Sequence, residues 1–210
     1  MKRAALGFRM HSGWGVLVAI SGDADSVQVL ERKRIVITDP GMPGASQPYH
    51  HAAELESKES ESHIANCAAT SERLALAAIE QVQRELHRRE YRIVGSAVLL
   101  ASGRPLPPLA KILASHPLIH TAEGEFFRNR IRNACEQLRI SVEAIREREL
   151  EERWKAAFGN SASRVQRRIA IAGSSIGPPW TKDHKAAALA ALIVLSRVEP
   201  VISRSVHQEP

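Results

Sequence analysis

The sequence predicts an α/β domain in which a mixed β-sheet, antiparallel in its first strands, carries helices on both faces. Three observations predict it. The first third of the 210-residue chain alternates short apolar runs with turn residues, the middle third alternates helical and strand-like patterns, and the last third is helical. Strands that are followed by alternating helices and strands are typical of a mixed sheet that is covered by helices.

The bulk composition is that of a globular protein. Apolar residues make up 44% of the chain, which is enough for a core, whereas aromatic residues make up only 4%, so the core must be mainly aliphatic. Cys67 and Cys135 lack metal-ligand spacing and are expected to be buried free thiols. We expect one domain over residues 1–200, followed by a flexible tail at 201–210.

Short apolar segments in the first forty residues predict a meander of antiparallel strands, because a hairpin-type turn at 21–25 separates two of them. These segments are 4–8, 14–20, 27–30 and 35–37.

Residues 39–61 are predicted to be a long loop insertion that passes into the start of a helix. The segment contains three prolines, two glycines, the pair His50 and His51, and a Glu/Ser-rich end. The role of the two histidines stays open.

The remainder of the chain alternates between helix and strand. The apolar run 93–100 predicts a strand buried on both faces, and 141–145 predicts a second, shorter strand. Apolar periodicity and capping residues predict helices over 71–90, 107–115, from Thr121 to about 139, and over 147–158, 163–171 and 182–197.

Charge and hydropathy bear on the partners. The net charge is +6 and is concentrated in the C-terminal half, which favours a polyanion such as nucleic acid. The longest apolar run, 186–195, is about half of a membrane span, so we expect no membrane partner and a cytoplasmic protein. A homo-oligomer is compatible with this composition.

The order of the elements resembles that of the RNase H-like superfamily, and in detail the RuvC-type Holliday-junction resolvases. Leu6-Gly7 followed by Gly13-Trp14-Gly15-Val16-Leu17 is similar to their first hairpin. The segment 123–139 is similar to their long middle helix, and 182–190 is similar to their last helix.

The resemblance implies a metal-dependent phosphodiesterase whose acidic site is degenerate here. In the family, four acidic groups hold two divalent ions that activate water. The aspartate of the first strand corresponds to Arg9, and the central strand, within 94–99, contains no acid. On the last helix Asp183 remains, but Ala186 stands where a second acid is expected.

Two sets of polar residues are candidates for remaining chemistry. A rebuilt catalytic site would use His11, Glu123, Glu125 and Asp183, with Mg²⁺ or Mn²⁺ held by Glu123 and Asp183. Ligand-binding candidates are Arg9, Arg104, His120, Lys182 and His184. Helix capping is the structural alternative for the acids and for the residues around Thr181.

Three hypotheses follow. The first is an RNase H-like domain that binds nucleic acid or a protein partner without cutting DNA. The second is a divalent-metal-dependent phosphodiester or nucleotide hydrolase with a rebuilt site. The third is a structural subunit of an assembly.

Overall fold

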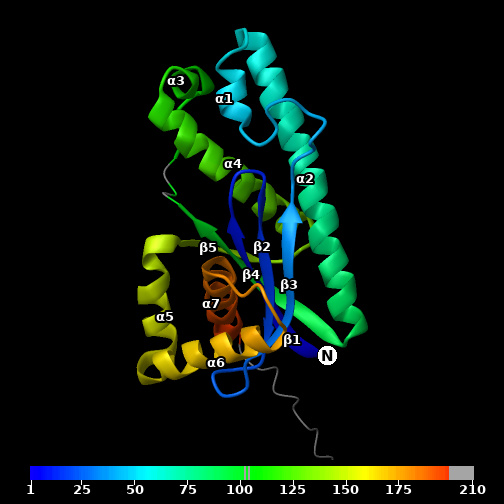
Figure 1. Cartoon of the computed structure of the whole chain (residues 1–210), viewed down its shortest axis with the longest axis vertical. Helices are drawn as coiled ribbons and strands as arrows, with labels where there is room; N and C mark the ends of the chain where they lie inside the picture. The colour runs from blue at the N-terminus through cyan, green and yellow to red at the C-terminus, as the bar shows by residue number, and fades with distance from the viewer. Residues whose placement is uncertain (102, 104, 199–210) are drawn as a thin grey trace, which may run out of the picture.

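The computed structural model describes residues 1–198 except 102 and 104. Five strands form one mixed sheet in the order β3-β2-β1-β4-β5 (Figure 1). The first three strands pair antiparallel, β4 runs parallel to β1, and β5 runs parallel to β4. Their bounds are β1 Lys2–Met10, β2 Trp14–Ser21, β3 Gln28–Val36, β4 Tyr91–Leu100 and β5 Val142–Arg146. The predicted α/β class with a mixed sheet is confirmed, as is the order of elements that carries the RNase H-like resemblance.

Helices cover both faces of the sheet, as predicted. On one face lie the two longest helices, α2 Ser57–Arg88 and α4 His116–Gln137, and on the other lies α7 Lys182–Arg197 (Figure 1). The remaining helices are α1 Pro48–Ala52, α3 Leu109–Leu113, α5 Leu150–Phe158 and α6 Ala162–Ser175.

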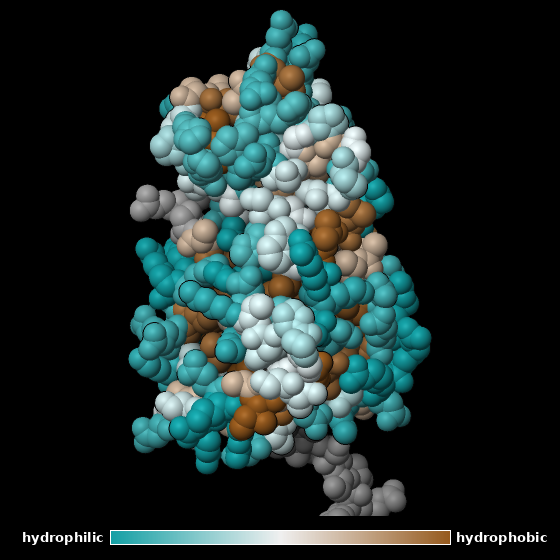
Figure 2. Space-filling view, viewed as in Figure 1, coloured by the Kyte–Doolittle hydropathy of each residue, from teal (hydrophilic) through white to brown (hydrophobic). Residues whose placement is uncertain are grey.

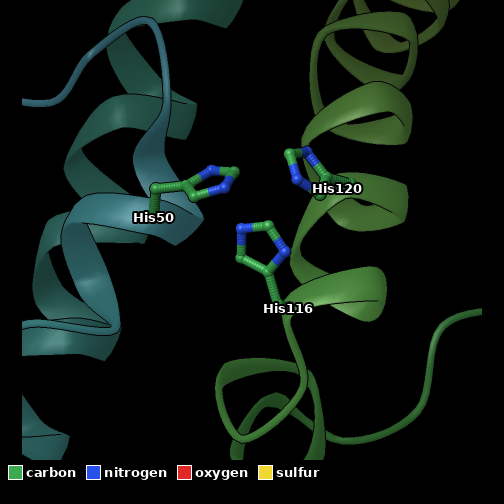
Figure 3. Close-up of side chains that lie close together, drawn as sticks. All are labelled: His50, His116 and His120. Atoms are coloured by element: carbon green, nitrogen blue, oxygen red, sulfur yellow. The ribbon is translucent and has the colours of Figure 1, made fainter.

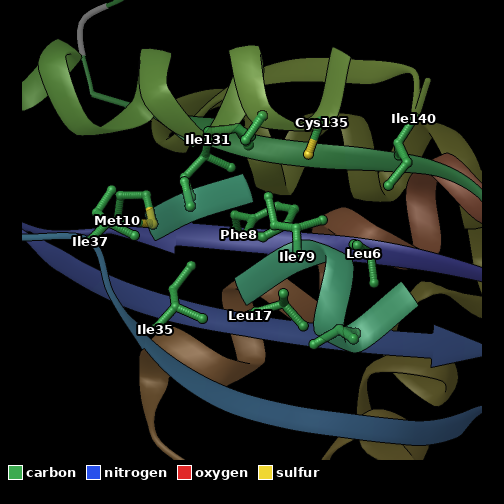
Figure 4. Packing of buried hydrophobic residues seen from close by; sticks show 14 of the residues in the cluster. Leu6, Phe8, Met10, Leu17, Ile35, Ile37, Ile79, Ile131, Cys135 and Ile140 are labelled. Atoms are coloured by element: carbon green, nitrogen blue, oxygen red, sulfur yellow. The ribbon is translucent and has the colours of Figure 1, made fainter. Parts of the chain in front are cut away.

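The core is divided by the sheet because successive side chains of a strand point to opposite faces. On β1, Leu6, Phe8 and Met10 pack toward Ile79 of α2 and Ile131 of α4 (Figure 4). Ala5 lies in the second cluster, with the apolar residues of α7. The two faces therefore have separate cores, and α7 packs on β1 and β2 with small side chains.

Gly7 shows how closely α7 approaches the sheet. A Cβ at this position would overlap the backbone carbonyl of Ala187. The Ala-rich segment of α7 supplies the other half of this close approach, since Ala187, Ala188, Ala190 and Ala191 are all buried.

The segment 39–61 differs from the predicted loop. It contains α1, which begins at Pro48, and the first turn of α2, which begins at Ser57. Pro48 suits the first turn of a helix, and the buried Ser60 hydroxyl donates to the Ala52 carbonyl (2.6 Å), joining the two helices. The periodicity missed the part of α2 before residue 71 because its buried side chains there, Ser60 and Cys67, are small and form no apolar stripe.

Three other boundaries differ from the predictions. Helix α4 begins at His116, and Thr121 lies inside it with its hydroxyl donating to the Pro117 carbonyl (3.0 Å). Strand β3 continues through the charged segment between the two short strands that were predicted. It can carry these charges because it is an edge strand. Helix α3 is shorter than the predicted helix 107–115.

The predicted tail 201–210 lies outside the described residues. Among those that are described, no helix has the length and apolarity needed to cross a membrane.

Candidate functional site

Arg9 lies near the carboxyl end of β1, next to carboxylates from two other elements. Its guanidinium donates to Glu147, with Nη2–Oε2 at 2.9 Å and Nε–Oε1 at 3.2 Å, and also to Oδ1 of Asp183. Glu147 directly follows β5, and Asp183 is the second residue of α7. Strand ends and a helix start thus meet here, where the family resemblance places acidic residues.

His11 extends this cluster. Its Nε2 lies 2.8 Å from Oδ2 of Asp183, and its ring stacks on Trp14 with centroids 4.4 Å apart. Partial burial lowers the pKa of His11, and the Arg9 and Arg128 guanidiniums lower it further. Glu147 acts in the opposite direction. With its hydrogen on Nε2, His11 donates to the Asp183 carboxylate, which can only accept.

A second arginine lies beneath the strand ends. Arg128 is buried, and its guanidinium donates to the carbonyls of Leu99 (2.9 Å), Met10 (3.4 Å) and Gly124. Burial lowers the pKa of Arg128, while Glu125 and Glu147 act in the opposite direction. Arg128 thus adds a second cation to this edge of the sheet.

These residues do not fit a two-metal centre. Hard divalent ions need several carboxylates whose charge is free to balance that of the ions. Here Asp183 and Glu147 are both paired with Arg9, and Arg128 lies close enough to be influenced by Glu147. An arginine stays protonated at any ordinary pH, so Arg9 cannot lose its charge to make room for a metal ion.

Glu123 and Glu125 are placed differently from the rebuilt site that was hypothesised. Oε1 of Glu123 accepts from the backbone N–H groups of Tyr49 (2.8 Å) and His50 (3.0 Å), and Oε1 of Glu125 accepts from the Gly103 N–H (3.2 Å). Burial raises the pKa of Glu123, and the His50 contacts oppose this. The structure brings His11 and Asp183 together but gives Glu123 different partners, so it offers no support for a metal shared by Glu123 and Asp183.

His120 belongs to another cluster. His50, His116 and His120 each offer a ring nitrogen, and these atoms all lie within 4.8 Å of one another (Figure 3). In the described part of the chain, this is the one group of three or more His, Cys, Asp or Glu residues whose ligand atoms gather in this way.

The candidates around the start of α7 divide into two kinds. His184 is buried, and its Nδ1 accepts from the Thr181 backbone N–H (3.1 Å), which supports the capping alternative. Its ring also stacks on Trp180, with centroids 5.7 Å apart. Lys182, in contrast, is exposed. Arg104 lies outside the described residues.

Sequence reasoning missed Glu147, Arg128 and His116. Glu147 had a usable signal, since it follows a predicted strand and ligands bind at strand ends in α/β sheets. His116 stands four residues before His120, a spacing that places both on one face of α4, but the sequence predicted that this helix begins at Thr121 and so did not reveal the pair. Arg128 had no such signal in the sequence, because an arginine in a helix is usually exposed to solvent.

A surface hollow lies at the opposite end of the strands from Arg9. It has a volume of about 560 Å³, and its lining includes Val27, Val29, Tyr91 and Arg168. None of the predicted site residues that the structure describes lines it.

Comparison with known proteins gives structural likeness alone. No family model matches the chain, and no curated protein sequence matches it. Two structures of RuvC from Thermus thermophilus, one of them in complex with a Holliday junction substrate, share 14% sequence identity with this chain, and their TM-scores are 0.49 and 0.47. Each alignment covers 92% of this chain and 93% of the RuvC chain. The yeast mitochondrial Holliday junction resolvase Ydc2 is 11% identical with a TM-score of 0.43, covering 91% of this chain and 76% of its own. With TM-scores below 0.5, the assignment of the fold rests on the strand order of the sheet itself.

Proposed function

We propose that this chain is an RNase H-like domain that binds nucleic acid without hydrolysing it at a two-metal centre. The observation that carries the proposal is the pairing of Arg9 with Asp183 and Glu147 at the carboxyl end of β1. The positively charged guanidinium of Arg9 already pairs with both of the carboxylates that a metal at this edge would need.

The charge of Arg9 disfavours the binding of a divalent ion to Asp183 and Glu147. A metal that approached Asp183 or Glu147 would have to displace the guanidinium of Arg9, or share the carboxylates with it at short range. Two like charges that close repel strongly in a partly buried site, where the effective dielectric constant is well below that of water. The Arg9 and Asp183 side chains are 18% and 20% exposed, so solvent screens the repulsion only in part.

Basic side chains around this edge support a polyanionic partner. Lys182 and Arg148 are exposed, and each is the neighbour in sequence of a carboxylate that pairs with Arg9. The net charge of +6 acts in the same direction. The face in Figure 2 is largely hydrophilic, and its apolar patches are small and separate.

A binding assay with a matched charge control tests the proposal. Because a similar structure is named as RuvC with a Holliday junction substrate, a labelled four-way DNA junction is the first probe, beside duplex DNA and an RNA–DNA hybrid. We expect binding that weakens as salt rises, and a loss of about tenfold for Lys182→Glu with Arg148→Glu. Lys58→Glu with Arg73→Glu, at two exposed positions of α2, makes the same change of charge on another helix and should change the affinity much less.

The same samples, with Mg²⁺ or Mn²⁺ added, distinguish binding from hydrolysis. We expect the probe to stay intact. Metal-dependent cleavage that Asp183→Ala abolishes would overturn the proposal in favour of the hydrolase, for which the His11–Asp183 contact of 2.8 Å is the favouring observation. Binding to none of the probes would leave a protein partner or a second copy of the chain as the ligand, which pull-down and solution mass would detect.

A further inference from the structure

Three imidazole side chains from two helices converge on one point. His116 and His120 project from the first two turns of α4, and His50 projects toward them from α1 (Figure 3). The ring centroids are 4.4 Å apart for His116 and His120, 4.8 Å for His50 and His120, and 5.6 Å for His50 and His116. We propose that these three histidines bind a transition-metal ion, with Zn²⁺ as the first candidate.

The backbone arrangement holds the donors in place. His116 and His120 are four residues apart on α4, so they lie on one face of that helix. His50 is fixed to the same helix through Glu123, whose Oε1 accepts from the backbone N–H groups of Tyr49 and His50. The carboxylate that joins α1 to α4 thus stands one turn after His120, beside the histidines.

Glu123 also orients the ring of His50. Its Oε1 lies 3.2 Å from Nδ1 of His50, and the Glu123 side chain is 6% exposed. Histidine ligands of metals commonly donate their second ring N–H to a carboxylate, which fixes the tautomer and the orientation of the ring. With Nδ1 engaged in this way, Nε2 of His50 is the nitrogen left for a metal.

The donor set selects the class of metal. Imidazole nitrogens suit Zn²⁺, Cu²⁺, Ni²⁺ and Co²⁺, whereas Mg²⁺ and Ca²⁺ prefer oxygen ligands. Zn–N bonds of about 2.0–2.1 Å in a tetrahedral site place the nitrogens about 3.4 Å apart. Since the donor atoms already lie within 4.8 Å, and the His116 and His120 side chains are exposed, rotation of these side chains can close the difference. Three ligands leave a fourth position for water.

A metal here would have a structural consequence. It would clamp α1, in the segment 39–61 after the N-terminal strands, to the first turns of α4. Ligand binding to the folded state alone raises its stability according to occupancy. The site contains neither Arg9 nor Asp183, so this proposal does not depend on the proposed function.

The test uses the full-length, tag-free chain, stripped of metal and titrated with Zn²⁺ by calorimetry. The absorption spectrum of bound Co²⁺ serves as a second readout, because it reports tetrahedral coordination. We expect one ion per chain. His116→Ala and His120→Ala should each weaken binding by more than about 100-fold, and Glu123→Gln by about 10- to 100-fold, as for other carboxylates that orient a histidine ligand.

His51→Gln is the matched control. His51 is the next residue on α1, but its ring lies beside His63 of α2, with centroids 4.6 Å apart. This variant removes one histidine without touching the proposed site, so its affinity for Zn²⁺ should equal that of the wild type. Circular dichroism of the metal-free variants checks their folding. Wild-type protein that does not bind Zn²⁺, histidine variants that bind it as the wild type does, or equal loss in His51→Gln would each overturn the proposal.

Discussion

Arg9 pairs with two carboxylates that are 138 and 174 residues away in the sequence, so its ion pairs join β1 to the segment after β5 and to the start of α7. All three side chains are partly buried. Removing one partner from such a group leaves the others without a countercharge, which costs more than the pairs themselves contribute.

We therefore expect Arg9→Gln to lower the free energy of unfolding by about 1–3 kcal/mol. Urea denaturation measures the loss. The double variant Arg9→Gln with Asp183→Asn should lose less than the sum of the two single variants, because the second change removes a charge that the first left unpaired. Additive losses would mean that the two side chains do not interact.

His184 makes the stability depend on pH. Burial lowers its pKa below the ordinary value of 6.5, and the nearby Arg32 guanidinium lowers it further. The unfolded chain then binds more protons than the folded chain as the pH falls below about 6.5, so the free energy of unfolding should fall in that range. His11 and His63, whose pKa values are also lowered, act in the same direction, whereas the raised pKa of Glu123 opposes them.

The contribution of His184 is isolated by a difference measurement. Denaturation of wild type and His184→Gln between pH 8 and pH 5 should show the wild-type advantage shrinking as the pH falls, because the other groups cancel in the difference. His87→Gln, at an exposed position, should follow the wild type throughout. A wild-type advantage that grows toward acid pH would contradict this account of His184.

At the scale of the elements, the contact between α7 and β1 depends on Gly7. A methyl group at this position would overlap the Ala187 carbonyl, which belongs to helix backbone and cannot rotate away. We expect Gly7→Ala to lower the free energy of unfolding by about 1–3 kcal/mol, as overpacking of a core does. Thermal and urea unfolding would measure it. Gly41→Ala, in an exposed loop, should stay within about 0.5 kcal/mol of the wild type; equal losses would mean that the close approach is unimportant.

Elements with regular apolar patterns were predictable from the sequence, and those built on other interactions were not. Strands β1, β2 and β4 and helix α7 are long and apolar, so periodicity located them to within a few residues. Helix α1 spans only five residues, and its Tyr49 and His50 N–H groups donate to a carboxylate of α4. Such contacts between distant residues leave no local pattern in the sequence.

At the scale of the whole molecule, the partners of a site residue depend on how distant segments pack, and the sequence does not predict that packing. Arg9 could be recognised as a departure from the family pattern, but its partner Glu147 could not be assigned without knowing that β5 lies beside β4 and that β4 lies beside β1. The histidine cluster similarly needs α1 and α4 side by side. Pairings of this kind follow from the packing of distant segments, which periodicity does not report.

The charge of the whole molecule should govern how nucleic acid binds. If phosphate contacts dominate, the logarithm of the affinity should fall linearly with the logarithm of the salt concentration, with a slope of about −0.9 per phosphate contacted. Anisotropy titrations at several salt concentrations give this slope, which Lys182→Glu should make shallower by about one unit. Affinity that does not change with salt would contradict a partner held through phosphates.

The most direct test of the central claim, that Arg9 closes the acidic edge to divalent metal, is thermal unfolding with and without Mg²⁺. We predict no stabilisation of the wild type. Arg9→Asp, which adds a third carboxylate beside Asp183 and Glu147, should gain about 1.4 kcal/mol at a Mg²⁺ concentration ten times its Kd, a shift of a few degrees. Stabilisation of the wild type by Mg²⁺ that Asp183→Ala abolishes would contradict the claim. It would mean that a metal binds the carboxylates that pair with Arg9.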